Sequence, residues 1–164
     1  MAWVYISLGS NIDREALTLA GVRSLQKQYG DLVLSSVYES EAVGFEGDSF
    51  YNMVIALQTD ESVTDVAQVL HAIEDEHGRD RSGPRFSSRT LDLDLLLYDD
   101  LVISEDKLQI PRDEILERAF VLWPMAEVAP DLIHPQVNKT YGELWSEFDK
   151  KKEKLEPIAF DFSK

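Results

Sequence analysis

The stretch Thr90-Leu91-Asp92-Leu93-Asp94-Leu95-Leu96-Leu97-Tyr98 reads as a β-strand that carries two carboxylates. Side chains alternate along a strand that rises ~3.3 Å per residue, so Asp92 and Asp94 are expected on one face with Cα atoms ~6.5–7 Å apart. The other face then receives Leu91, Leu93, Leu95 and Leu97. The pattern of this strand predicts a sheet with one apolar face and with a pair of carboxylates on the opposite face.

An ordinary half-exposed antiparallel strand also alternates apolar and polar residues. Aspartate, however, is depleted from strands, so two aspartates among five leucines are unfavourable unless a ligand offsets their cost. Two carboxylates held close repel each other unless one is protonated or a cation lies between them. Carboxylate oxygens suit Mg²⁺, and this spacing suits a bridged pair of ions. We therefore expect Asp92 and Asp94 to be metal ligands.

An arginine-rich segment comes directly before this strand and carries Arg79, Arg81, Arg85 and Arg89. Guanidinium groups bind phosphate oxygens in bidentate geometry. The alternative is a solvated basic turn, which is the poorer interpretation in a chain with a net charge of −15. Arginines next to a metal-binding carboxylate pair indicate a polyphosphate substrate and phosphoryl chemistry.

Length and composition predict one domain spanning residues 1–164, because 164 residues with 44% hydrophobic content suit one core. The net charge of −15 argues against nucleic-acid and membrane binding, so small-molecule substrates are expected. The absence of cysteine excludes disulfides and cysteine-based zinc sites. No apolar run approaches ~20 residues and no signal peptide is recognisable, which predicts a soluble, cytoplasmic protein. We also expect a monomer.

Hydrophobic periodicity predicts strands over residues 2–8, 32–39, 50–57 and 90–98, and helices over 13–29 and 63–78. The first helix is expected to be capped from the turn Gly9-Ser10-Asn11, and the second to start with a capping box at Ser62. The order β-α-β-β-α-β predicts an α+β, ferredoxin-like sandwich, in which two helices cover one face of an antiparallel sheet.

The ferredoxin-like core is expected to span about residues 1–100, followed by a helical C-terminal extension over about 101–164. Within that extension, short helical pieces over 112–128 are predicted to be interrupted by Pro124 and Pro130. A last helix is expected over 141–148. The tail from Lys150 onward is charged and is predicted to be frayed.

Several motifs together carry a resemblance to a known family. They are Tyr5-Ile6-Ser7-Leu8-Gly9-Ser10-Asn11, Gly78-Arg79-Asp80-Arg81, Arg89-Thr90-Leu91-Asp92-Leu93-Asp94 and Arg118-Ala119-Phe120-Val121-Leu122-Trp123-Pro124. The chain resembles 6-hydroxymethyl-7,8-dihydropterin pyrophosphokinase from its start to about Pro135. The resemblance implies a ferredoxin-like fold and transfer of pyrophosphate from ATP to the pterin hydroxymethyl group, with release of AMP, in folate biosynthesis.

The resemblance also implies roles for individual residues. Arg79, Arg89, Asp92 and Asp94 would be catalytic, with two Mg²⁺ ions on the aspartates. The ATP contacts would be His71, Glu74, Arg81, Arg85, Leu95, Lys107, Leu108, Gln109, Arg112 and Arg118. The pterin contacts would be Ser40, Val43, Gly44, Phe50, Asn52, Phe86, Asp92 and Phe120. An aromatic wall with an in-plane amide suits a flat heterocycle.

Two departures from the family pattern leave other functions open. The family's Pro-His pair is Pro111-Arg112 here, and Ser87-Ser88 stands where the family favours glycine and a small residue or proline. Arginine adds charge but does not titrate near neutrality. A catalytically weakened paralogue that binds pterin or nucleotide is therefore one alternative. A two-metal nucleotidyltransferase is another. An RNA-binding sheet is disfavoured by the net charge.

Overall fold

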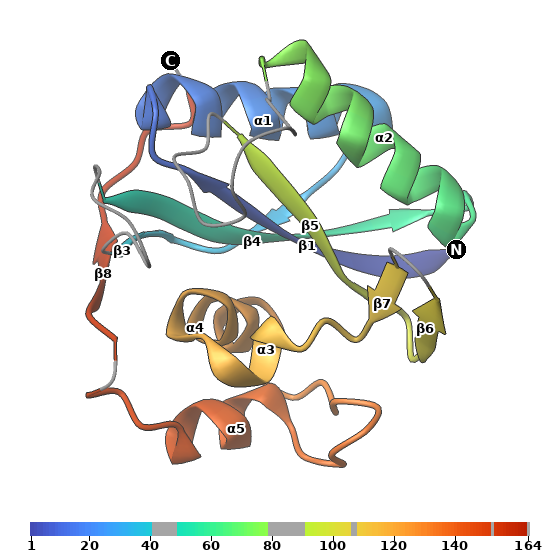
Figure 1. Cartoon of the computed structure of the whole chain (residues 1–164), viewed down its shortest axis with the longest axis vertical. Helices are drawn as coiled ribbons and strands as arrows, with labels where there is room; N and C mark the ends of the chain where they lie inside the picture. Colours follow the sequence, from blue (N-terminus) through green and yellow to red (C-terminus); the bar gives the residue numbers. More distant parts are fainter. Residues whose placement is uncertain (41–48, 79–90, 106–107, 152, 164) are drawn as a thin grey trace.

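A single antiparallel sheet forms the centre of the protein. The computed structural model describes residues 1–40, 49–78, 91–105, 108–151 and 153–163. The sheet contains β1 (Ala2–Ser10), β2 (Val33–Leu34), β3 (Val37–Ser40), β4 (Phe50–Thr59), β5 (Asp92–Tyr98) and β8 (Leu155–Ile158). Its order is β5-β1-β4-β3-β8, with β2 also paired to β4 (Figure 1). This strand order confirms the predicted ferredoxin-like sandwich.

Helices cover both faces of the sheet. On one face lie α1 (Arg14–Tyr29) and α2 (Val63–Glu76), as predicted. On the other lie α3 (Glu114–Glu117), α4 (Ala119–Val128) and α5 (Tyr141–Glu147), which come from the C-terminal extension (Figure 1). Each face has its own hydrophobic cluster, the first around Val22, Leu25 and Leu70 and the second around Leu96, Leu122 and Met125. The sheet is therefore buried on both sides.

The two helices of the first face begin differently. The hydroxyl of Ser62 accepts a hydrogen bond from the Asp65 N–H at 3.2 Å, so the predicted start of α2 is confirmed. The cap predicted for α1 from the turn at residues 9–11 is wrong. Strand β1 continues through Ser10, and α1 begins after Asp13, which has a φ of 47° and makes no side-chain cap.

The second predicted strand, over residues 32–39, is divided into β2 and β3. Ser35 causes the break, because its side chain replaces a bond of the sheet ladder: its hydroxyl accepts a hydrogen bond from the Val54 N–H at 2.9 Å and donates to the Ser36 carbonyl at 2.7 Å. Serine side chains compete with the backbone in this way.

A β-bulge in β5 corrects the predicted placement of Leu97. Tyr5 pairs with Leu97 and Ile6 pairs with Leu95, so Leu96 has no partner in β1. Because the extra residue reverses the alternation of side chains, Leu97 joins the second cluster, while Leu93 and Leu95 remain in the first. Asp92 and Asp94 precede the bulge and keep the alternation that the sequence predicts.

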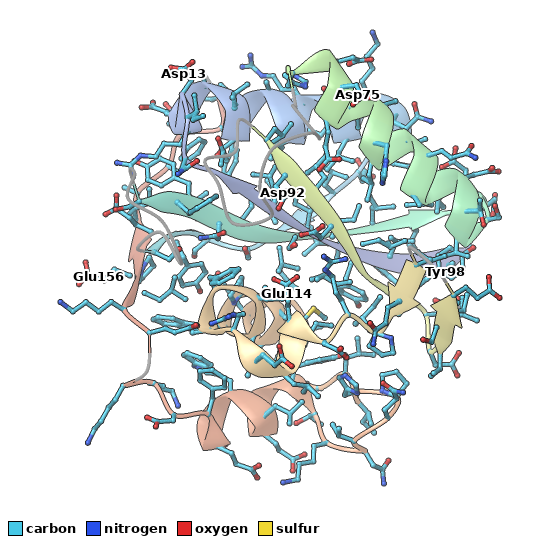
Figure 2. All side chains as sticks on the ribbon, in the orientation of Figure 1. Asp13, Asp75, Asp92, Tyr98, Glu114 and Glu156 are labelled. Carbon is cyan, nitrogen blue, oxygen red and sulfur yellow. The ribbon has the colours of Figure 1, made fainter. Side chains whose placement is uncertain are left out.

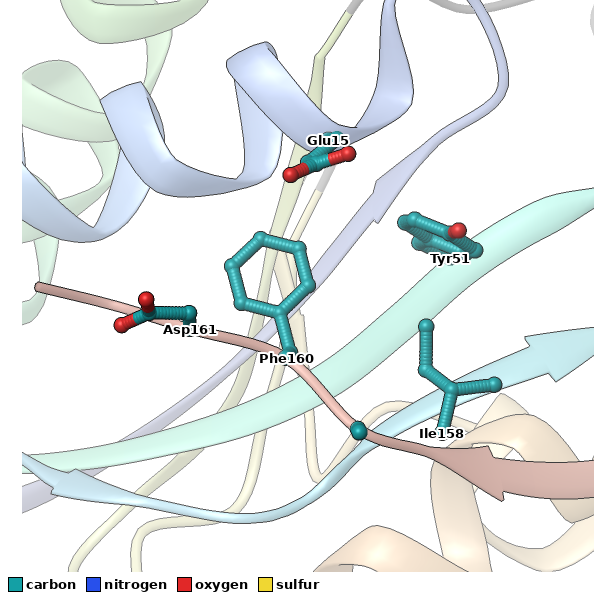
Figure 3. A pocket seen from close by; sticks show the side chains of 6 residues that line it. Glu15, Tyr51, Ile158, Phe160 and Asp161 are labelled. Carbon is teal, nitrogen blue, oxygen red and sulfur yellow. The ribbon is translucent and has the colours of Figure 1, made fainter. Parts of the chain in front are cut away.

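The described part of the C-terminal tail from residue 155 to 162 packs on the sheet, which corrects the prediction that this part is frayed. Strand β8 pairs with β3, and beyond it Phe160 and Phe162 pack against the first cluster. The Phe160 and Tyr51 rings meet edge to face at 6.2 Å (Figure 3). A hollow of about 320 Å³ lies beside them, lined partly by Glu15 and Asp161. Apolar residues among the charges anchor the tail to the sheet.

The extension also contains a small hairpin of β6 (Ile103–Glu105) and β7 (Leu108–Ile110). The predicted interruption at Pro124 is wrong, because α4 continues through it. Pro124 is buried together with Val121, Leu122 and Met125. This packing holds the helix on both sides of the proline although proline cannot donate a backbone hydrogen bond. Within the described ranges, no helix is long and apolar enough to cross a membrane.

Candidate active site

The two aspartates of β5 lie on the face of the sheet that α3 and α4 cover. Asp92 pairs with Gly9 of β1 and Asp94 with Ser7. Both side chains are partly buried. Figure 2 shows Asp92 on β5 and Glu114 on α3 below the sheet. The predicted carboxylate pair is thus present on one face of an edge strand, next to the helices of the extension.

Arg112 is the cation that the described residues place closest to this pair. Its N–H donates to the carbonyl of Leu96 at 3.1 Å, so the bulge residue positions it. Its guanidinium lies 3.5 Å from an Asp94 oxygen and 3.0 Å from an oxygen of Glu114. Glu114, which was not among the predicted site residues, therefore shares the guanidinium with Asp94.

Burial, followed by the charge of Asp92, raises the pKa of Asp94 from the ordinary value of 3.8 to about 7. Arg112 opposes this shift, while Glu114 and Glu74 add to it. One guanidinium therefore does not balance the negative charge of this cluster. A cation bound between the aspartates would favour their charged forms, so this site fits a divalent metal ion.

Glu74 connects α2 to the edge of β5. It is buried at 3% exposure, and its carboxylate accepts a hydrogen bond from the Leu93 N–H at 2.8 Å. Leu93 stands between the two aspartates, on the strand at the edge of the sheet. Glu74 thereby holds the backbone that carries the acidic pair. Its predicted contact with ATP stays a prediction.

We predict that Glu74→Ala destabilises the protein by about 1–3 kcal/mol, because the buried Leu93 N–H loses its acceptor. Glu74→Gln keeps an acceptor and should lose less. Urea unfolding followed by circular dichroism measures both. Glu76→Ala is the matched control, since Glu76 is an exposed glutamate at the end of the same helix. Equal stability of Glu74→Ala and Glu76→Ala would contradict the prediction.

A second group of predicted residues lies on β3 and β4, which β1 separates from the aspartates of β5. The Asn52 amide donates to the Ser40 hydroxyl at 2.7 Å, and both side chains are buried. Phe50 pairs with Ser40 across the two strands. A Cβ atom at Gly9 would lie 3.1 Å from the Asn52 side-chain oxygen and 3.8 Å from the Phe50 ring. Glycine therefore leaves open the space between Asn52 and the acidic strand.

Phe120 and Arg118 are brought to this face by the start of α4. Phe120 is partly buried against the second cluster. Arg118 precedes the helix and pairs with Glu153 at 3.0 Å. Glu153, like Gly9 and Glu114, was not among the predicted site residues. Gly9 had a signal in the sequence, because it is part of the motif Gly9-Ser10-Asn11. Glu114 and Glu153 had none, because their pairing with Arg112 and Arg118 is defined only by the folded chain.

The remaining predicted ATP contacts within the described ranges lie on α2, β5 and β7. His71 is exposed on α2, and the Leu95 side chain is buried in the first cluster. Leu108 lies on β7, where the neighbouring Gln109 donates to Asp113 at 3.0 Å. Eight predicted residues fall outside the described ranges, namely Val43, Gly44, Arg79, Arg81, Arg85, Phe86, Arg89 and Lys107. The departure at Ser87-Ser88 lies there as well.

The described ranges contain no cluster of three or more histidine, cysteine, aspartate or glutamate side chains placed to hold one metal ion. Asp92 and Asp94 are a pair, and pairs of this kind bind Mg²⁺ together with phosphate oxygens and water. The structure therefore defines a ferredoxin-like domain with an acidic site on the edge strand β5, on one side of Gly9, and an amide-and-aromatic site around β4, on the other side.

Comparison with known proteins gives the family. Residues 5–130 match the family described as 7,8-dihydro-6-hydroxymethylpterin-pyrophosphokinase. The 2-amino-4-hydroxy-6-hydroxymethyldihydropteridine pyrophosphokinase of Porphyromonas gingivalis is 39% identical over 142 residues, which are 83% of this chain and 96% of that protein. The Haemophilus influenzae protein of the same name is 36% identical over 162 residues, 96% of this chain and 100% of that one. The chain belongs to this family.

Some relatives are much longer. The folic acid synthesis protein FOL1 of Dictyostelium discoideum is 37% identical over 146 residues, which are 86% of this chain but only 22% of that protein. A solved HPPK-DHPS structure in complex with substrates aligns with a TM-score of 0.74 at 10% identity, covering 92% of this chain and 44% of that chain. The chain thus spans about a fifth of the Dictyostelium discoideum protein and under half of the solved HPPK-DHPS chain. The structural likeness establishes the fold.

Proposed function

We propose that this protein transfers pyrophosphate from ATP to 6-hydroxymethyl-7,8-dihydropterin and releases AMP, a step of folate biosynthesis. The observation that carries the proposal is the position of Gly9, which pairs with Asn52 on one side and with Asp92 on the other. Strands lie ~4.8 Å apart, so the amide and the carboxylate extend from backbones roughly 10 Å apart across an open glycine. A flat bicyclic substrate can therefore bind at Asn52 with its hydroxymethyl group toward Asp92.

For the pterin, Asn52 supplies in-plane hydrogen bonds, and the Ser40 hydroxyl fixes the orientation of its amide. Phe50 and Phe120 offer apolar surface for the ring faces. These side chains come from β3, β4 and α4, and each of these elements contributes buried residues to the hydrophobic clusters. A site built on rigid elements orients the substrate before the reaction, which is the main contribution a protein makes to phosphoryl transfer.

For ATP, Asp92 and Asp94 would hold Mg²⁺, which neutralises charge on the triphosphate when it is bound. Arg112 and Arg118 supply guanidinium groups on the same face. The loop arginines Arg79, Arg81, Arg85 and Arg89 remain proposed phosphate contacts on the ground of the family pattern. We also propose that the protein acts as a cytoplasmic monomer on these two small molecules alone, which light scattering checks for the oligomeric state.

Incubation with MgATP, with and without 6-hydroxymethyl-7,8-dihydropterin, tests the proposal when the nucleotides are separated by chromatography. AMP formed only in the presence of the pterin is the expected result. Formation of pyrophosphate instead would indicate nucleotidyl transfer. Binding of both ligands in a calorimeter without any AMP would indicate a weakened paralogue that serves as a binding module.

Arg112 allows a prediction about ATP alone. Arg112→Ala should raise the KM for ATP about tenfold, because a charged hydrogen-bond donor to phosphate is removed. The Kd for the pterin should stay nearly unchanged, since the ion pairs of Arg112 within the described ranges are with Asp94 and Glu114. Steady-state kinetics and calorimetry measure the two constants. Arg23→Ala, on the exposed side of α1, serves as the control. An unchanged KM for ATP would remove Arg112 from the ATP site.

A further inference from the structure

The start of α4 is held by a carboxylate from a distant part of the chain. One oxygen of Glu153 accepts a hydrogen bond from the Ala119 N–H at 2.6 Å. The other lies 3.0 Å from a guanidinium nitrogen of Arg118. The first N–H groups of a helix have no partner within the helix, and a negative charge there is favourable. Glu153 therefore satisfies α4 and the adjacent arginine with one side chain.

The segment that carries Glu153 is itself firmly attached. Two residues further on, Leu155 begins β8 and stands opposite Ser40 of β3. The same short segment thus touches the strand that carries Ser40 and the helix that carries Phe120. The Glu153 side chain is only 18% exposed, which fits a fixed contact better than a transient surface pair. Residue 153 also lies beyond the residues 5–130 that match the family.

We propose that Glu153 is a positioning residue of the active site. Through Arg118 it sets the position of an ATP contact, and through the Ala119 N–H it sets the first turn of α4 and hence the position of Phe120 against the pterin. This inference rests on the proposed function, because it assigns the ATP contact to Arg118 and the pterin contact to Phe120.

The two contacts are separable by substitution. Glu153→Gln keeps an oxygen that can accept from the Ala119 N–H but removes the charge that pairs with Arg118. It should raise the Kd for ATP about threefold to tenfold and leave the Kd for the pterin within twofold. Glu153→Ala removes both contacts. It should weaken the binding of ATP and of the pterin, each by about threefold to tenfold.

Calorimetry with Mg²⁺ and a non-hydrolysable ATP analogue measures the first constant, and titration with 6-hydroxymethyl-7,8-dihydropterin measures the second. Neither requires turnover, so a wild-type protein that binds both ligands without forming AMP refutes the proposed transfer and still tests Glu153. Glu156→Ala is the matched control, because Glu156 is an exposed glutamate of β8 opposite Glu39. It should leave both constants unchanged.

Hydrogen exchange at the Ala119 amide provides a readout that is independent of ligands. Exchange should be faster in Glu153→Ala and close to wild type in Glu153→Gln and Glu156→Ala. Two results would overturn the proposal. One is wild-type affinity for both ligands in Glu153→Ala. The other is tighter ATP binding in Glu153→Ala, which would show that the carboxylate competes with ATP for Arg118.

Discussion

Asp94→Asn protein is expected to fold normally and to lose its activity by at least about 10²–10³ in kcat, the scale on which one electrostatic group aimed at a phosphoryl transition state acts. The asparagine has nearly the size of the aspartate but cannot supply the negative charge that Mg²⁺ requires. Pterin binding should remain measurable, because Asn52, Ser40 and Phe50 are untouched. Asp92→Asn should behave alike in activity, whereas unaltered turnover in either variant would remove the metal assignment.

Asp94→Asn is also expected to change the stability of the protein against unfolding in the absence of Mg²⁺. Burial and the charge of Asp92 raise the pKa of Asp94 to about 7, so the folded protein binds this proton more tightly than the unfolded chain does. The stability that Asp94 contributes is therefore present below its ordinary pKa of 3.8 and is lost as the pH rises toward about 7. Asp94→Asn does not titrate. At pH 8 it should be more stable than wild type by on the order of 1 kcal/mol, after allowance for solvent screening and for the lost pair with Arg112.

Unfolding in EDTA at several pH values between 4 and 8 measures this difference. The stability difference between Asp94→Asn and wild type should grow as the pH rises from 4 to about 7 and become constant above that. Added Mg²⁺ and ATP should stabilise the wild type and not the variant, because ligands stabilise only the state that binds them. A variant that is less stable than wild type at every pH would mean that the pair with Arg112 outweighs the burial of charge.

Asn52→Ala is expected to weaken pterin binding by about 10²-fold and to change the affinity for ATP little. Removing a buried hydrogen-bond partner of a polar ligand lowers the binding affinity far more than removing an apolar contact does. The alanine also leaves the buried Ser40 hydroxyl without its donor. The substitution is therefore expected to lower the folding stability as well as the affinity for the pterin. The affinity must be measured under conditions in which the variant is folded.

Calorimetric titration with the pterin, at a temperature at which circular dichroism shows a folded variant, measures the effect. Ser40→Ala is the control, because it removes the contact that orients Asn52 and keeps the amide itself. It should weaken pterin binding less than Asn52→Ala does. Equal losses would mean that the Ser40–Asn52 hydrogen bond supports the strands and that the amide does not meet the ligand.

Much of the architecture could be predicted because it follows from local pattern. The alternation of leucine and aspartate over residues 91–94 and the capping residue Ser62 act through neighbours in sequence, and the structure agrees with both. The departures arise where another strand or helix intervenes. Leu97 changes face because of a bulge that is defined only by pairing with β1, and the tail is ordered because β3 offers it an edge.

Residue types at fixed spacing were enough to predict the carboxylate pair of β5, the β-α-β-β-α-β order and the family. The groups that complete the site could be identified only in the folded protein. Gly9 lies between Asn52 and Asp92, Glu74 binds the backbone of Leu93, and Glu153 reaches the start of α4. Contacts between residues far apart in the chain depend on strand register and packing, which no local pattern specifies.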